Sequence, residues 1–334
     1  MRILALAVFS TSLVAQSIVV PAANENARGT GGTNTLTRGT GAPRTYMLGI
    51  DASHLTGIPV GSIINGVSFR TNVSTSNPAS WPAVDTTWTP YDVLIGPAIP
   101  INSWTTTFMS NFAATPTVAR AGAMVITPGT YTTNTGLPAP QPNPWGEFFW
   151  DFQTPFTYTG GDLAIYFAHP GSDQANQVFF DTVASAPAAG YAAYSASAYQ
   201  AATGASASFF ITRIHYGYGA GCPGTGGLTP NLVQTNNTTG GGTVKFSIAN
   251  APANAPAAYA IGVGRTSVTL PNGCTLLTNP AVLLPVALDN HGRFLLSLNV
   301  PAGVIGTLNV QAAVVDVGAV GGYTLSNATE LTAN

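Results

Sequence analysis

The chain has 334 residues, enough for two domains of ordinary size. Only 7% of the residues are charged, the formal net charge is −2, and Lys245 is the single lysine. Binding of nucleic acid or of an anionic membrane surface requires clustered Lys and Arg, so this composition excludes both partners. A hydrophobic content of 45% argues against a disordered chain.

Residues 1–16 are predicted to form a signal peptide. Arg2 supplies the positive charge, Ile3 to Ala15 form a short apolar segment, and residues 13–16 offer a cleavage region. Cleavage within Pro21 to Ala23, or a buried N-terminal strand, are the alternatives. No other apolar run approaches the roughly 18 residues of a membrane-spanning helix. We therefore expect an extracellular or cell-surface protein without a transmembrane segment.

Residues 17–44 are low in complexity and are predicted to form a flexible leader. The sequence Arg-Gly-Thr-Gly occurs at 28–31 and again at 38–41. A basic tether for an anionic wall polymer is the alternative, based on Arg28, Arg38 and Arg44.

The first domain is expected over residues 45–216, because its apolar residues alternate with a period of two. Val67 and Phe69 share a face of one predicted strand. Two further triplets alternate in the same way: Phe148, Trp150, Phe152 and Leu163, Ile165, Phe167. Turn sequences such as Asn77-Pro78 separate the predicted strands. The pattern predicts an antiparallel, jelly-roll-like β-sandwich.

A Gly-rich hinge at 217–221 is predicted to lead into a second domain over residues 222–334. Strands that alternate over 244–248, 294–300 and 308–314 indicate six or seven antiparallel strands. An immunoglobulin-like or similar sandwich is expected, which makes the whole chain all-β. Cys222 and Cys274 are the only cysteines, and export to an oxidising compartment favours a disulfide between them.

Several stretches of the chain resemble a family of secreted proteins abundant in planctomycetes and related bacteria. The sequences at 217–230, 271–276 and 323–332 resemble the C-terminal domain of that family. The sequences at 49–53, 64–70 and 154–163 are similar to the N-terminal β-sandwich of some members. The resemblance implies secretion and two β domains, and it implies no activity and no site residues.

The sequence contains no catalytic motif, so we expect a protein that is not an enzyme. There is no Gly-x-Ser-x-Gly sequence, and none of the four histidines lies in a recognisable motif. Glu147 and Asp151 share a strand face but lie about 13 Å apart, too far for a direct glycosidase pair. We expect no metal site; calcium bound through Asp51, Asp173 and Asp181 is the alternative.

Aromatic residues crowd one part of the first domain and form the candidate binding site. They are Trp81, Trp88, Tyr91 and Trp104. Flat aromatic rings can stack on sugar rings without the help of charge. Packing in the core is the alternative, although the sequence around Trp81 and Trp88 is typical of loops and favours exposure of those two.

Three functions follow from these patterns. The first is a secreted structural or adhesive protein of the cell envelope, which associates with other envelope proteins or with itself. The second is a carbohydrate-binding protein that uses the aromatic residues to hold a polysaccharide. The third is an unrecognised hydrolase.

Overall fold

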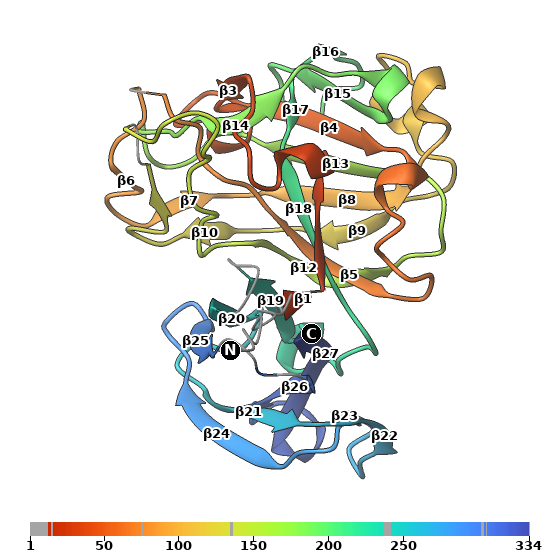
Figure 1. Cartoon of the computed structure of the whole chain (residues 1–334), viewed down its shortest axis with the longest axis vertical. Coiled ribbons are helices and arrows are strands. Elements are labelled where there is room, and N and C mark those ends of the chain that lie inside the picture. Colours follow the sequence, from red (N-terminus) through yellow and green to blue (C-terminus); the bar gives the residue numbers. More distant parts are fainter. Residues whose placement is uncertain are drawn as a thin grey trace, which may run out of the picture. The chain divides into compact units, whose positions relative to one another are not determined.

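The computed structural model describes residues 13–14, 16–74, 76–133, 136–236, 242–301, 304 and 306–333. It is all-β, as predicted: the described helices are 3-10 turns of three or four residues. The chain divides into two compact units, shown in Figure 1. The N-terminal unit is Ile18–Tyr216. The C-terminal unit contains the described residues from Gly217 onward, together with Leu13, Val14, Gln16 and Ser17.

The N-terminal unit is built on a six-stranded antiparallel sheet. Its order is β16 (Ala205–Ser206), β15 (Tyr191–Ala196), β4 (Arg44–Ile50), β13 (Leu163–His169), β8 (Asp92–Pro97) and β9 (Thr117–Arg120). The central pairings are continuous, with Ile165 opposite Leu48 of β4 and opposite Ile95 of β8.

Smaller sheets complete this unit. A four-stranded sheet has the order β12 (Trp150–Thr157), β5 (Ile63–Ser68), β18 (Thr212–Gly217) and β2 (Ser17–Val20). A three-stranded sheet has the order β17 (Phe209–Phe210), β14 (Phe180–Val183) and β3 (Gly31–Thr33). Two short pairs are β10 (Met124–Ile126) with β7 (Thr86–Trp88), and β11 (Tyr131–Thr132) with β6 (Ser80–Trp81).

One apolar core joins these sheets, and the predicted alternation places residues in it. Val67 and Phe69 are fully buried. The residues of the two triplets are at most 5% exposed: Phe148, Trp150, Phe152 and Leu163, Ile165, Phe167. The other face of the six-stranded sheet is covered as well. Ile101, Trp104, Phe108 and Phe112 pack on Met47, Ala164 and Tyr166 there, so every residue of β13 is buried.

Residues 18–44 are not a flexible leader but part of the N-terminal unit. The segment supplies β2 and β3, and Leu36 is fully buried. Arg70 donates to the carbonyl oxygens of Glu25 (3.0 Å) and Ala27 (2.6 Å), while Asp181 accepts from the backbone N–H of Gly29 (2.9 Å). A buried ion pair joins Arg70 to Asp181 at 3.0 Å.

The low complexity of this segment has a steric reason at Gly29. A Cβ atom there would lie 2.2 Å from the carbonyl oxygen of Thr182, so only glycine fits against β14. The sequence suggested flexibility because it contains few apolar residues. The anchor that orders it, Asp181, lies 152 residues away.

Removing the Arg70 guanidinium should release this segment. Arg70→Met leaves the Asp181 carboxylate buried without its cation, at a cost of about 3–5 kcal/mol. We expect faster tryptic cleavage after Arg28 or Arg38, followed by mass spectrometry. Arg265→Met is the control: it breaks an exposed ion pair with Glu330, worth at most about 1 kcal/mol. Equal protection in both variants would show that the anchor is unimportant.

His169 at the end of β13 is held in its neutral form. Its Nε2 lies 3.0 Å from the carbonyl oxygen of Thr35, while its Nδ1 accepts from the N–H of Gly171 (3.1 Å). Because Nδ1 accepts, Nε2 carries the proton and donates to Thr35. Burial lowers the pKa of His169 to about 4, and Arg44 acts in the same direction; the hydrogen bond to Thr35 acts against it.

This histidine should make the N-terminal unit sensitive to acid. In the unfolded chain, His169 binds a proton below its ordinary pKa of about 6.5. In the folded chain it stays neutral until the pH falls to about 4. Stability contributed by neutral His169 is therefore complete above pH 6.5 and declines on acidification, by about 3 kcal/mol at most. Denaturant unfolding at pH 7 and pH 4.5 should show a smaller loss for His169→Gln than for the wild type. An equal loss would contradict the assignment.

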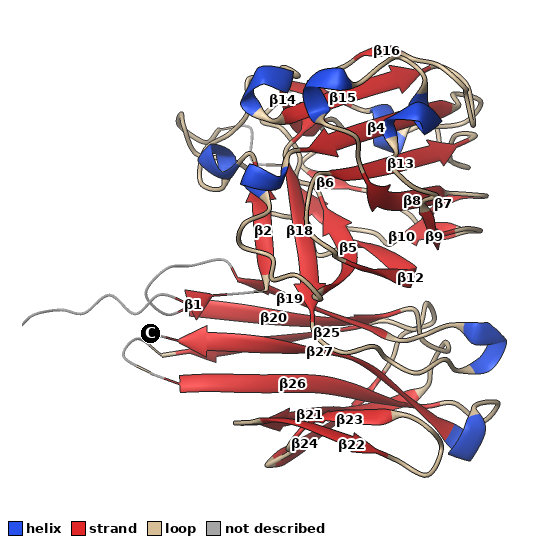
Figure 2. Cartoon of the chain, turned by 90° about the vertical axis from the view of Figure 1, so that its right-hand side faces the viewer, coloured by secondary structure: helices blue, strands red, loops and turns tan. Residues whose placement is uncertain are grey.

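The C-terminal unit contains two sheets that share one core (Figure 2). The five-stranded sheet has the order β1 (Leu13–Val14), β27 (Tyr323–Ala333), β26 (Gly306–Val315), β21 (Pro256–Gly262) and β24 (Val282–Ala287). The three-stranded sheet has the order β19 (Asn231–Asn236), β20 (Gly242–Ala249) and β25 (Phe294–Val300). A separate pair is β22 (Arg265–Thr269) with β23 (Thr275–Thr278).

Phe246 and Ile248 of the three-stranded sheet meet Tyr259 and Val310 of the five-stranded sheet in this core.

Leu13 and Val14, from the predicted signal peptide, pair with Ala333 and Thr332 at the end of β27. Most of the remaining residues of that peptide lie outside the described residues. The jelly-roll-like and immunoglobulin-like topologies stay predictions.

Candidate interaction surface

The four aromatic residues predicted to bind sugar are buried. Trp81 is 1% exposed, Trp88 and Tyr91 are 0% exposed, and Trp104 is 8% exposed. The loop-like sequence around Trp81 and Trp88 forms the short strands β6 and β7, which close over the main core. The prediction that Trp81 and Trp88 are exposed was wrong, because turn-forming neighbours say nothing about which surface a strand covers.

The structure brings three of the four aromatic residues together and separates the fourth. Trp88 lies 6.4 Å from Trp81 and 5.9 Å from Tyr91, measured between ring centroids. Trp104 packs in the other cluster, against Gly49, where a Cβ would lie 2.3 Å from the indole. The Trp88 indole donates to the carbonyl oxygen of Arg38, and the Tyr91 hydroxyl donates to that of Leu36. The rings of Trp88 and Tyr91 therefore anchor residues 18–44, and none of the buried rings offers a surface on which a sugar could stack.

The acidic residues considered for catalysis or calcium are used within the fold. Asp151 is 2% exposed and forms a buried ion pair with Arg120. Asp51 accepts from the N–H of Ser53, and Asp173 accepts from the N–H of Thr87. Within the described residues, no group of three or more His, Cys, Asp or Glu side chains is placed to hold a metal ion.

Ser68 and His215 form a hydroxyl–imidazole pair that the sequence did not reveal. The Ser68 Oγ lies 2.6 Å from His215 Nε2, because β5 and β18 are neighbours in the four-stranded sheet. The two residues are 2% and 0% exposed, and the ring of Phe149 lies 6.0 Å from the imidazole. A substrate has no access to the Ser68 hydroxyl at this burial.

Four exposed aliphatic residues lie in or beside two linked turns of the C-terminal unit. One turn carries η7 (Thr225–Gly227) and the other carries η8 (Val320–Gly322), as Figure 2 shows. We call their exposed aliphatic residues the valine tip: Leu228 (42% exposed), Val315 (44%), Val317 (94%) and Val320 (74%). Val317 is the most exposed large hydrophobic side chain among the described residues.

A buried carboxylate joins the two turns. Asp316 accepts from the backbone N–H of Thr225 (2.7 Å), from the Thr225 hydroxyl, and from the N–H of Gly318 (3.1 Å). Burial acts to raise the pKa of Asp316, but these hydrogen bonds outweigh it and lower the pKa below the usual range. The carboxylate therefore stays ionised and bonded at neutral pH, between the exposed Val315 and Val317.

The turns approach so closely that two glycines are required. A Cβ on Gly224 would lie 2.1 Å from Asp316 Oδ2, and one on Gly318 would lie 2.2 Å from the Thr225 hydroxyl oxygen. The glycines thus allow the contact that fixes the valine tip, rather than making it flexible.

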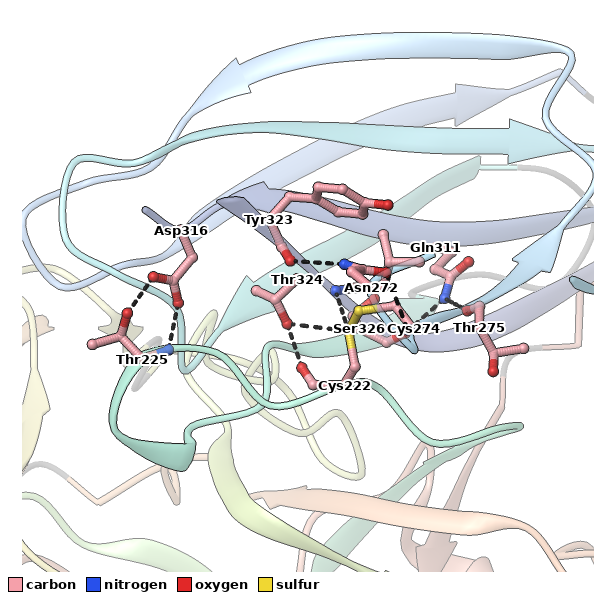
Figure 3. The surroundings of a disulfide bond; sticks show 11 residues. Cys222, Thr225, Asn272, Cys274, Thr275, Gln311, Asp316, Tyr323, Thr324 and Ser326 are labelled. Carbon is pink, nitrogen blue, oxygen red and sulfur yellow. Dashed lines mark hydrogen bonds between the residues drawn. A yellow bond between two sulfur atoms is a disulfide. The ribbon is translucent and has the colours of Figure 1, made fainter. Parts of the chain in front are cut away.

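The Cys222–Cys274 disulfide, predicted from the sequence, lies next to this linkage (Figure 3). Cys222 exchanges backbone and sulfur contacts with Leu325: its N–H donates to the Leu325 carbonyl (2.9 Å), and its Sγ lies 3.2 Å from the Leu325 nitrogen. Asn272 accepts from the N–H of Cys274 (3.1 Å) and donates to the carbonyl of Tyr323 (3.2 Å). The segment before η7 and the turn between β22 and β23 are therefore both bonded to β27, and the disulfide links them to each other.

The Gln311 side chain extends this network across the sheet. It accepts from the N–H of Leu277 (2.9 Å) and donates to the carbonyl oxygens of Thr275 (3.1 Å) and Ser326 (2.8 Å). The result is a base of hydrogen bonds and a disulfide that presents apolar side chains to solvent and keeps the Asp316 carboxylate buried, an arrangement suited to contact with another apolar surface.

The valine tip was not among the sites predicted from the sequence. The available clue was the run Val315-Asp-Val-Gly-Ala-Val-Gly-Gly322, in which valines follow a strand into a glycine-rich turn. Turns normally carry polar residues beside glycine, so valines there are unusual.

No family model, no curated protein and no solved structure matches this chain. Among the described residues, no helix has the length and apolar character needed to cross a membrane.

Loss of the disulfide should loosen the C-terminal unit. Cys222 and Cys274 are 52 residues apart, and a loop of that length corresponds to about 4 kcal/mol of unfolding free energy on the chain-entropy model. We expect the double variant Cys222→Ser/Cys274→Ser to unfold at lower denaturant concentration. The wild type in a thiol reductant should behave like the variant. A variant as stable as the oxidised wild type would contradict the structural role of the bond.

Proposed function

We propose that this chain is a secreted, non-catalytic protein of the cell envelope or the extracellular space, and that it has a structural or adhesive role. The observation that carries the proposal is the valine tip, four exposed aliphatic side chains on a hydrogen-bonded and disulfide-tied base. Apolar side chains held rigidly in water lose little conformational entropy when a partner covers them. Their burial on a partner is therefore favourable.

The composition supports the same role. Adhesion by apolar contact needs no ionisable groups, whereas catalysis by proton transfer or nucleophilic attack does. The ionisable residues described above are engaged inside the fold, as with Arg70 and Asp181. The disulfide is compatible with an oxidising compartment outside the cytoplasm, as the predicted signal peptide at 1–16 implies.

The alternative proposals have less support. Carbohydrate binding through Trp81, Trp88, Tyr91 and Trp104 would require these buried rings to become exposed. A hydrolase built on Ser68 and His215 would require the four-stranded sheet to open. The partner that best fits the valine tip is an uncharged apolar surface, such as an apolar patch on another envelope protein.

Serine substitutions at the two most exposed tip positions should reduce adhesion. We expect Val317→Ser/Val320→Ser to adsorb about tenfold more weakly than the wild type to methyl-terminated monolayers, because each change removes apolar area from the contact. A quartz crystal microbalance measures the adsorption, and hydroxyl-terminated monolayers give the background.

The matched control is Val60→Ser/Val263→Ser, which alters valines that are 72% and 76% exposed outside the tip. This control should adsorb like the wild type. An equal loss in both double variants would mean that adsorption is nonspecific, and no loss in either would refute a role for the tip.

A further inference from the structure

Strand edges are a second place where this chain can make contacts. An edge strand presents unpaired backbone N–H and C=O groups, and proteins usually guard it with charge, proline, a bulge or short length. With 7% charged residues, the chain can rely little on charge. Other guards are therefore needed at its strand edges.

Most terminal strands carry such a guard. β1, β16 and β17 have two residues each, and β3 has three. β12 contains Pro155 and a register shift, and register shifts also occur in the β8–β9 and β22–β23 pairings. On β19, the amide of Asn327 bonds both the N–H and the carbonyl of Leu232 (2.9 Å each).

β24 is guarded by Pro285. The N–H of Leu288 donates to the carbonyl of Ala255 (3.0 Å). In an antiparallel pair every second residue bonds to the neighbouring strand, so counting back from Leu288 gives the residues of β24 whose backbone groups bond to β21. Leu283, Pro285 and Ala287 therefore face the open edge. Pro285 has no N–H to offer, so the middle of this edge cannot donate to another strand.

β25 is the longest described terminal strand without such a guard. It is a terminal strand of seven residues with the sequence Phe-Leu-Leu-Ser-Leu-Asn-Val, and it contains no charge, proline or register shift. Arg293 and Pro301 lie just outside it, at either end. A segment of this length, β-prone, uncharged and free of proline, is the type that pairs with a further strand. Among the described strands, none pairs with its outer edge.

The two faces of β25 differ in a regular way. Phe294, Leu296, Leu298 and Val300 pack toward the core of the unit, while Ser297 and Asn299 are exposed on the other face. Residues directly opposite in an antiparallel pair point to the same face. A β25 strand paired with itself in full overlap would place Leu296 against Leu298, so the two apolar faces would be continuous.

We propose that β25 pairs antiparallel with β25 of a second copy of this chain, about a two-fold axis at Ser297. Full overlap places Ser297 opposite its own copy, Leu295 opposite Asn299, and Phe294 opposite Val300. The two three-stranded sheets then form one sheet of six strands. The dimer carries two valine tips, so weak contacts at each tip add through avidity.

Charge permits this self-pairing. From residue 217 onward the sequence has three basic residues (Lys245, Arg265, Arg293) and three acidic ones (Asp289, Asp316, Glu330), a formal sum of zero. Lys245 lies opposite Ser297 on β20, one strand in from the edge. Three strand spacings would separate the two Lys245 backbones, about 14 Å, which exceeds the screening length of about 8 Å at physiological salt.

The first experiment is cysteine cross-linking of the full chain. Ser297→Cys places two thiols opposite each other at the proposed axis, within reach of a disulfide. We expect a covalent dimer on mild oxidation in non-reducing gels. Ser267→Cys, an exposed serine on β22 of the same unit, is the control and should remain uncross-linked. Equal cross-linking of the two variants would overturn the proposed pairing.

The second experiment tests the register by charge. Leu295→Lys/Asn299→Lys places like charges across the interface twice, whereas Leu295→Lys/Asn299→Glu places opposite charges there. Both variants remove the Asn299 amide, whose oxygen accepts from the Thr243 hydroxyl within the chain. In sedimentation velocity over a concentration series, we expect the wild type to dimerise and the Lys/Glu variant to do so as well. The Lys/Lys variant should dissociate at least about tenfold more readily.

A wild type that sediments as a monomer at every concentration, or two charge variants that behave alike, would overturn the proposal. The outcome is separate from that of the adhesion experiment. Val317→Ser/Val320→Ser leaves β25 unchanged and should dimerise like the wild type, even where its adsorption is lost.

Discussion

The scarcity of charge is the constraint on which this structure depends. With 22 residues of Asp, Glu, Lys and Arg among 334, the chain cannot cover its surface with ions or guard each strand edge with lysine. Most of its described edges are instead short, bulged or interrupted by proline, as at Pro155 and Pro285, and β25 is not. The protein is left with uncharged surfaces, and apolar contact is the interaction open to them.

Two buried ion pairs join segments of the N-terminal unit. Arg70 and Asp181 fix the segment around Gly29, and Arg120 and Asp151 join β9 to β12. Arg120 also donates to the carbonyl of Asp151 (2.9 Å) and to that of Ala123 (3.1 Å). A buried ion pair adds little net stability, because the ions lose their hydration. We interpret these ion pairs as interactions that select which segments of the chain pack together.

The C-terminal unit reaches rigidity by other means. The disulfide, the Asp316–Thr225 linkage and the Gln311 amide fix the turns at one end, and glycine allows the turns to touch. The valines there are exposed because the backbone beneath them is held by polar bonds and does not need them for its core. Exposed apolar residues on a fixed base differ from the isolated exposed valines elsewhere on the chain, such as Val60.

The sequence by itself determined the strands and the covalent bond. Alternation at Leu163, Ile165 and Phe167 shows which residues share a face, because the side-chain period of a strand is two. A single pair of cysteines leaves one possible disulfide. Only the tertiary structure decided which faces are covered, because that depends on partners far away in the chain. Trp88 donates to the carbonyl of Arg38, and Tyr91 donates to that of Leu36. Gly29 donates to Asp181, and Thr225 donates to Asp316. No local sequence pattern contains any of these pairs.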